Sequence, residues 1–170
     1  EIMEGGYLIY IDETGKHGIV AALEDLREGA DSTSTYYFGH IWGCYNEYVF
    51  GSDRTAIGTG YLNTFDIVNQ GCETGNESST AAQAALNYVA DGYDDWYLPS
   101  IDELLEMYDA LIYGNLEDNI GGFETDGYPY YWSSTESNIQ SAWSLNLNNG
   151  GASDSSFKTN IFKVRPIRSF

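Results

Sequence analysis

Apolar residues follow two periods along this chain, a strand-like period near both ends and a helical one in the middle. The run 6–11 is rich in β-branched and aromatic residues, and turn residues at 12–15 separate it from a second apolar run at 18–23. Two such runs around a short polar turn are typical of a β-hairpin. The sequence therefore begins with a predicted hairpin.

The middle of the chain has helical spacing. The segment 101–112 is amphipathic, and Ser100 and Glu103 form a capping-box pair at its start. A second helix is predicted at 81–90, and 63–69 is suited to one or two helical turns. The stripe of the second helix that we expect to be buried consists of Ala82, Ala85, Leu86 and Val89.

After residue 120 the period returns towards two. The run 130–134 is typical of a strand, and 143–147 alternates as a half-exposed strand does. Residues 149–151 supply a tight turn, and the return strand is expected within 157–164. Helices enclosed by strands at both ends predict an α+β fold.

The length of the chain indicates how many domains it forms, and its charge excludes some classes of partner. The 170 residues fit one domain, 1–170. With 7 Lys and Arg against 26 Asp and Glu, the net charge is −19, which repels phosphate backbones and anionic lipids. No apolar run is long enough to span a membrane. We therefore expect neither a nucleic-acid partner nor membrane insertion. Four bases lie in the acid-free C-terminus and are expected to pair with the acidic body: Lys158, Lys163, Arg165 and Arg168.

Patterns that carry catalysis or bind metals are missing from the sequence. His17 and His40 stand in no metal-ligand spacing. Cys44 and Cys72 lack the CxxC spacing, so a disulfide and two buried thiols are equally open. The acidic loop 91–95 lacks the register of an EF-hand, and solvated carboxylates after a helix are favoured over a Ca²⁺ site. We expect no enzyme activity, no cofactor and no metal.

Residues 133–160 have the most unusual composition. They contain 8 Ser and 5 Asn, interrupted by Trp143, Leu145, Leu147 and Phe157. Small polar groups with rigid aromatic residues are typical of antibody-like binding loops. An ordinary exposed hairpin explains the same composition equally well.

Four ordered motifs give the chain a family resemblance. These are Asp-Asp-Trp-Tyr-Leu-Pro-Ser-Ile-Asp-Glu-Leu at 94–104, Tyr-Trp-Ser-Ser-Thr-Glu at 131–136, Ala-Trp at 142–143 and Lys-Val-Arg-Pro-Ile-Arg at 163–168. With them the chain resembles the DUF1566 family, also called the Legionella collagen-like C-terminal domain. That family is related to C-type-lectin-fold proteins, which include formylglycine-generating enzyme and the variable proteins of diversity-generating retroelements. The resemblance implies a C-type-lectin-like fold with two main helices and a ligand face on the C-terminal hairpin.

The retroelement branch fits the composition best, because its proteins vary binding residues by adenine mutagenesis on a fixed framework. It implies a phage or bacterial surface protein, located outside the cell or on a virion, with a protein or glycan ligand on a cell surface. A homo-oligomer is left open. The alternatives are a carbohydrate-binding adhesin without diversification and, less favoured, an enzyme of the formylglycine-generating type. The candidate ligand-binding residues are Ser137, Asn138, Ile139, Ser141, Ser144, Asn146, Asn148, Ser153, Asp154, Ser155, Phe157 and Asn160. The expected framework residues are Trp132, Glu136, Trp143, Lys158 and Arg165.

Overall fold

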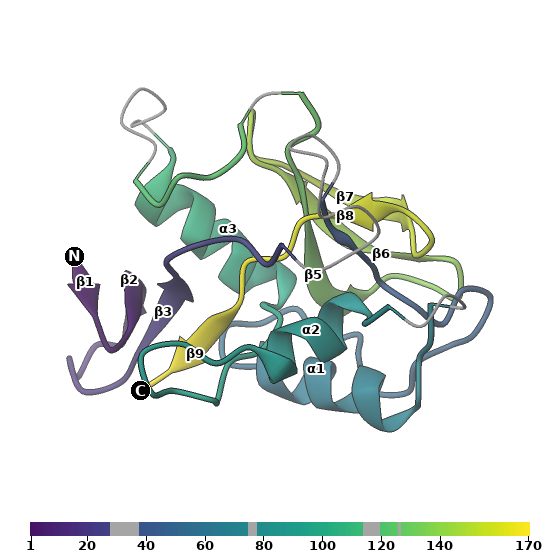
Figure 1. Cartoon of the computed structure of the whole chain (residues 1–170), viewed down its shortest axis with the longest axis horizontal. Helices are drawn as coiled ribbons and strands as arrows, with labels where there is room; N and C mark the ends of the chain where they lie inside the picture. Colours follow the sequence, from purple (N-terminus) through teal and green to yellow (C-terminus); the bar gives the residue numbers. More distant parts are fainter. Residues whose placement is uncertain (28–37, 75–77, 114–119, 126) are drawn as a thin grey trace.

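Helix α3 lies between a four-stranded and a three-stranded antiparallel sheet (Figure 1). The computed structural model describes residues 1–27, 38–74, 78–113, 120–125 and 127–170. The strand order is β1-β2-β3-β9 in the larger sheet and β5-β6-β7 in the smaller, and β4 pairs with β8. The predicted α+β class is therefore confirmed. The strands are β1 (Ile2–Met3), β2 (Gly6–Ile11), β3 (Gly18–Ala22), β4 (His40–Ile41), β5 (Tyr130–Glu136), β6 (Ser141–Asn146), β7 (Gly151–Phe157), β8 (Ile161–Phe162) and β9 (Ile167–Ser169).

The larger sheet contains both ends of the chain. Strands β2 and β3 form the predicted N-terminal hairpin. In its turn the Asp12 carboxylate accepts the Thr14 backbone N–H at 3.1 Å, and Gly15 has a φ of 68°, which suits glycine. Strand β9 pairs with β3, with Ala21 opposite Ile167. The first and last strands thus join the same sheet.

Helix α3 (Ile101–Leu111) follows its sequence signals closely. The Ser100 hydroxyl accepts the Glu103 N–H at 3.3 Å, and the Glu103 carboxylate accepts the Ser100 N–H at 2.7 Å, so the capping box is confirmed. The apolar stripe, with Leu104 and Met107, is buried in the core between the two sheets. Burial of this stripe stabilises the helix more than its intrinsic propensity does.

The other two helices depart from their predicted bounds, and the fold has three described helices instead of the expected two main ones. Helix α1 (Gly60–Asn69) starts three residues earlier than predicted. A Cβ at Gly60 would lie 2.2 Å from a Glu103 carboxylate oxygen, so a close approach to α3 requires glycine there. Helix α2 (Ala81–Asn87) ends early. Val89, expected to be buried, is 64% exposed.

The C-terminal region corrects two predictions. The return strand was expected within 157–164, but β7 starts at Gly151, directly after the turn. Its serine side chains carry no hydrophobic period, and its position is set by backbone pairing with β6. Strand β6 was expected to be half-exposed, but Ser144 is fully buried.

A second core lies beneath the C-terminal hairpin. It contains Trp42 and Trp132, both fully buried, together with apolar residues from α1 and β8. Each indole N–H donates to a backbone carbonyl, Trp42 to Ser133 at 2.9 Å and Trp132 to His40 at 2.8 Å. These bonds fix the orientation of both rings, so the second core gives rigid support to the C-terminal hairpin.

Candidate functional site

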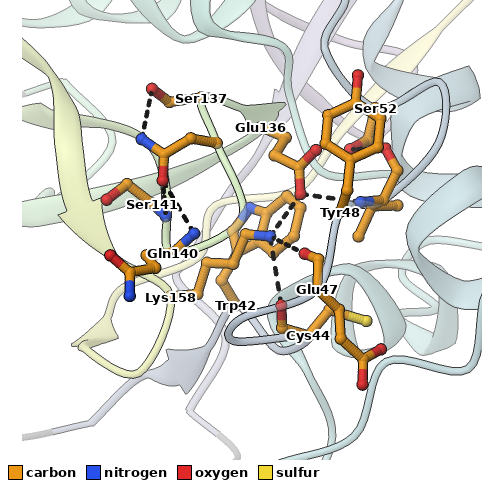
Figure 2. Close-up of polar contacts among 12 residues, drawn as sticks. Trp42, Cys44, Glu47, Tyr48, Ser52, Glu136, Ser137, Gln140, Ser141 and Lys158 are labelled. Atoms are coloured by element: carbon orange, nitrogen blue, oxygen red, sulfur yellow. Dashed lines mark hydrogen bonds and ion pairs between the residues drawn. The ribbon is translucent and has the colours of Figure 1, made fainter.

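A buried ion pair lies where the C-terminal hairpin meets the 44–52 loop (Figure 2). Glu136 ends β5, Lys158 follows β7, and both side chains are fully buried. The Lys158 ammonium donates to the Glu136 carboxylate and also to the carbonyls of Cys44 at 3.3 Å and Glu47 at 2.9 Å. It lies 4.7 Å from the Trp42 ring centroid. Burial lowers the pKa of Lys158, and the hydrogen bond to Glu136 opposes that change.

This pair holds surface segments that are far apart in the sequence. The Glu136 carboxylate accepts the Val49 N–H at 2.9 Å, and the Glu136 N–H donates to the Ser52 carbonyl at 2.7 Å. A disulfide between Cys44 and Cys72 attaches the start of the 44–52 loop to the segment after α1, with the two Cα atoms 4.8 Å apart. The structure therefore has the disulfide that the sequence left open.

One oxygen of the Glu136 carboxylate, Oε2, is buried and has no hydrogen-bond partner among the described residues. The neighbouring Tyr48 ring lies beside this carboxyl group (Figure 2), and the charge of Asp53 together with a smaller contribution from Glu136 raises the pKa of Tyr48. Buried carboxylate oxygens normally have a partner, so this acceptor is an unusual feature of the site.

Arg165, one of the expected framework residues, is buried and bound to several segments. Its Nε donates to an Asp25 carboxylate oxygen at 2.6 Å, and its Nη1 donates to the Ala22 and Gly121 carbonyls, both at 3.0 Å. The guanidinium lies 3.9 Å from the Phe123 ring centroid. These contacts join both ends of the chain to the segment before β5.

The other C-terminal bases are also paired. Arg168 donates to both Asp95 carboxylate oxygens, at 2.6 and 3.0 Å, and Lys163 donates to the Tyr128 carbonyl at 3.0 Å. The prediction that these bases pair with groups of the acidic body is confirmed. Asp95, part of the loop 91–95 considered for Ca²⁺, uses its carboxylate to bind Arg168.

Most candidate ligand-binding residues are on the surface. Exposed are Ser137, Asn138, Ile139, Asn148, Asp154, Ser155 and Phe157, and partly exposed are Asn146, Ser153 and Asn160. Strand β7 presents nearly all of its side chains to solvent; among them only Ser156 is buried.

Two candidates must be corrected because they lie inside the protein. Ser144 is fully buried, and its hydroxyl is 2.7 Å from that of Ser156 on the paired strand. Ser141 is 5% exposed, and its backbone N–H donates to the Asn138 side chain at 3.0 Å. Among the framework residues, Trp132 is fully buried, whereas Trp143 is only partly buried against the α3 core.

A neighbouring loop, which is not among the site residues expected from the sequence, carries exposed aromatic side chains. Tyr45, Tyr48 and Phe50 are 41%, 49% and 85% exposed. The Tyr45 ring makes an edge-on contact with Phe157, at 6.5 Å between centroids, and the Asn46 N–H donates to the Ile139 carbonyl at 2.8 Å. The high tyrosine content of this region was the available signal. We call residues 45–50, 137–140 and 153–157 the outer face.

The described residues contain no group of three or more His, Cys, Asp and Glu side chains that could hold a metal ion. Within the same residues, no helix combines the length and apolar character needed to cross a membrane.

Comparison with known families adds one finding. The family model described as the Lcl C-terminal domain matches residues 42–168. The chain belongs to the Lcl C-terminal domain family. This confirms the resemblance seen in the four motifs, which all lie within the matched part. The Lcl C-terminal domain of this chain includes the ion pair Glu136–Lys158 and the whole outer face. No curated protein matches the chain.

Proposed function

We propose that this chain is a non-enzymatic ligand-binding domain with a C-type-lectin-like fold, which binds a protein or glycan ligand on a cell surface through its outer face. The observation that carries the proposal is the contrast between the buried Glu136–Lys158 pair and the exposed side chains around it. The pair anchors the 44–52 loop and the C-terminal hairpin to each other. Rigid support beneath adaptable polar and aromatic groups is what a recognition surface requires.

The same contrast supports diversification by a retroelement. Trp132, Glu136, Lys158 and Arg165 are buried, while ten of the twelve candidate variable residues are at least partly exposed. Substitutions at exposed positions cost little stability, so such a surface tolerates replacement. The encoding DNA provides the check, because a missing template repeat beside a reverse-transcriptase gene would remove diversification from the proposal.

The disulfide supports a location outside the cell. Disulfides persist mainly in secreted proteins, in the periplasm and on cell or virion surfaces. Enzymes of the formylglycine-generating type, which the chain resembles through its family, bind copper with a pair of cysteines. Because Cys44 and Cys72 are bonded to each other, neither is a thiolate available for such a site. This argues against the enzyme of the formylglycine-generating type.

A pair of substitution experiments tests the role of the outer face. A library randomised at Ser137, Asn138, Ile139, Asp154, Ser155 and Phe157 is displayed and selected for binding to a chosen protein and to a glycan array. We expect most clones to stay folded, with free energies of unfolding within about 0.5 kcal/mol per substitution of the parent. Binders to the chosen targets are expected to be recovered from them.

The matched framework control is Lys158→Met, which leaves a buried carboxylate without its partner and should cost about 3–5 kcal/mol. Urea unfolding of purified variants measures both effects. If randomised clones unfold as readily as the framework variant, or if folded clones never acquire binding, the outer face is not a recognition surface. Glycan binding by the parent that is lost in an Asn146→Ala/Asn148→Ala variant would favour the adhesin alternative.

A further inference from the structure

We infer that the outer face recognises a cationic ligand, namely a peptide or protein segment that presents Lys or Arg side chains. The inference rests on the proposed function and specifies its ligand class. It comes from the charges, the rings and the unpartnered acceptor of the face.

The outer face and its rim carry acids without an available base. Glu47 and Asp53 are exposed. Arg54 is the only Lys or Arg between residues 28 and 157, and it is paired with Asp66 at 2.8 Å. Lys158, the next base along the chain, is buried against Glu136. A positively charged ligand meets favourable potential here, while an anionic one is repelled.

The rings of the outer face are suited to cations. Tyr48 and Phe50 are exposed, and Tyr45 packs edge-on against Phe157. Asp53 directly follows Ser52, whose carbonyl accepts the Glu136 N–H at 2.7 Å, so this acid lies at the end of the loop that carries the rings. A ring face beside a carboxylate attracts ammonium and guanidinium groups.

The protein already uses this combination for its own cations. Lys158 lies over Trp42 while bound to Glu136, and Arg168 lies 3.8 Å from the Tyr93 ring centroid while bound to Asp95. The outer face has the rings and the carboxylates of such sites, but among the described residues no cation of the chain occupies it. A ligand that supplies the cation would complete the arrangement.

The buried Glu136 Oε2 atom is an independent indication of a ligand. It has no hydrogen-bond partner among the described residues and lies beside Tyr48, at the inner edge of the outer face. A buried acceptor without a donor is costly. A ligand N–H group that reaches past the Tyr48 ring would satisfy it.

The test uses three labelled twelve-residue peptides that alternate glycine with lysine, serine or glutamate. Fluorescence anisotropy measures their binding to the whole chain at low and at physiological salt. We expect the lysine peptide to bind, the glutamate peptide not to bind, and affinity for the lysine peptide to fall as salt rises.

Charge reversals then locate the attraction. The face variant Glu47→Lys/Asp53→Lys is compared with Glu13→Lys/Asp109→Lys, which makes the same change in net charge at exposed acids of the N-terminal hairpin and α3, outside the outer face. We expect roughly tenfold weaker binding for the face variant and less than about threefold for the control. Glu47→Gln/Asp53→Asn is the isosteric variant if the reversal impairs folding.

Tyr48→Leu separates the contribution of the aromatic ring to peptide binding from that of the carboxylates. The substitution keeps an apolar side chain at this position and removes the π face. It should weaken lysine-peptide binding by about two- to fivefold. Equal losses in the face and control variants would assign the attraction to the overall charge and overturn the inference, as would equal binding of the glutamate peptide. If outer-face clones still bind their selected targets in that case, the proposed function stands and only the cationic ligand class fails.

Discussion

At the residue scale, the C-terminal bases act as internal connectors. Lys158, Lys163, Arg165 and Arg168 are all buried, and each donates to a carboxylate or a backbone carbonyl. Because a buried charge is costly without partners, each of these side chains fixes the segment that supplies its acceptor. Their positive charge is therefore paired inside the protein and adds little to its surface potential.

Arg165→Ala should reduce stability while sparing the outer face. The substitution leaves Asp25 buried without its cation, and we expect the free energy of unfolding to fall by about 3 kcal/mol. Lys16→Ala, at an exposed base, is the control and should stay within about 0.5 kcal/mol of the parent. Urea unfolding and the lysine-peptide assay are made on the same samples. A variant with parental stability but weaker peptide binding would contradict the framework role.

The framework residues could be predicted from the sequence more readily than the surface residues could. Lys158 and Arg165 stand out because bases are rare in this chain and cluster at its end. Tyr45 and Phe157, in contrast, are 112 residues apart in sequence and meet in a fold where Lys158 binds the carbonyls of Cys44 and Glu47, a contact that no local pattern reports. Ser144 was misassigned because a buried serine pair across two strands has the same composition as an exposed one.

At the scale of elements, local signals decided what could be predicted. Helix α3 carries its own cap and its own apolar stripe, so its bounds followed from the sequence. Strand β7 carries neither, because its position depends on pairing with β6. Helix α1 starts where its first residue, Gly60, meets Glu103 of α3, and no local pattern reports such a contact.

The start of α3 also contains a pH-sensitive group. Glu103 is fully buried, and burial raises its pKa above the usual 4.5, although N–H groups of Ser100 and Gly58 oppose the shift. A raised pKa in the folded state means that the stabilising contribution of protonation is complete below pH 4.5. That contribution is lost as the pH rises through the folded-state pKa.

Glu103→Gln should therefore remove a pH dependence. Relative to the variant, the parent should lose stability as the pH rises above 4.5 and through the folded-state pKa, with a slope of at most about 1.4 kcal/mol per pH unit. Urea unfolding at several pH values measures the difference. Asp102→Asn, in the same helical turn, is the control and should follow the parent. Parallel curves for the parent and Glu103→Gln would show that the carboxyl has the same pKa in both states.

At the scale of the whole molecule, the acidic surface and the disulfide act together. A net charge of −19 favours solubility but produces repulsion between segments of the folded chain. The 44–52 loop, with the exposed Glu47, is held against this repulsion by Lys158 and by the Cys44–Cys72 bond. One cation and one covalent link therefore add to the hydrogen bonds with Glu136 and Ile139 that hold this loop.

Loss of the disulfide should destabilise the protein and weaken the outer face. For a loop closed over 28 residues we expect a decrease of about 3 kcal/mol in the free energy of unfolding. Binding of the lysine peptide should weaken as well, because the 44–52 loop is freed at one end. The chain has two cysteines, so a reductant acts on this bond alone. Cys44→Ser/Cys72→Ser should match the reduced parent and not respond to reductant. A reductant-insensitive parent would exclude a structural role for the bond.

The position of the first and last strands in one sheet has a practical meaning for engineering. Both chain ends belong to the sheet at one side of the molecule, where β1 and β9 are its two edge strands, whereas β7 and the outer face lie at the other side (Figure 1). A host protein could therefore receive this domain as an insertion, through two linkers that both leave from this sheet. The inserted domain would project its serine-rich hairpin away from the host, as a scaffold for display of randomised loops should.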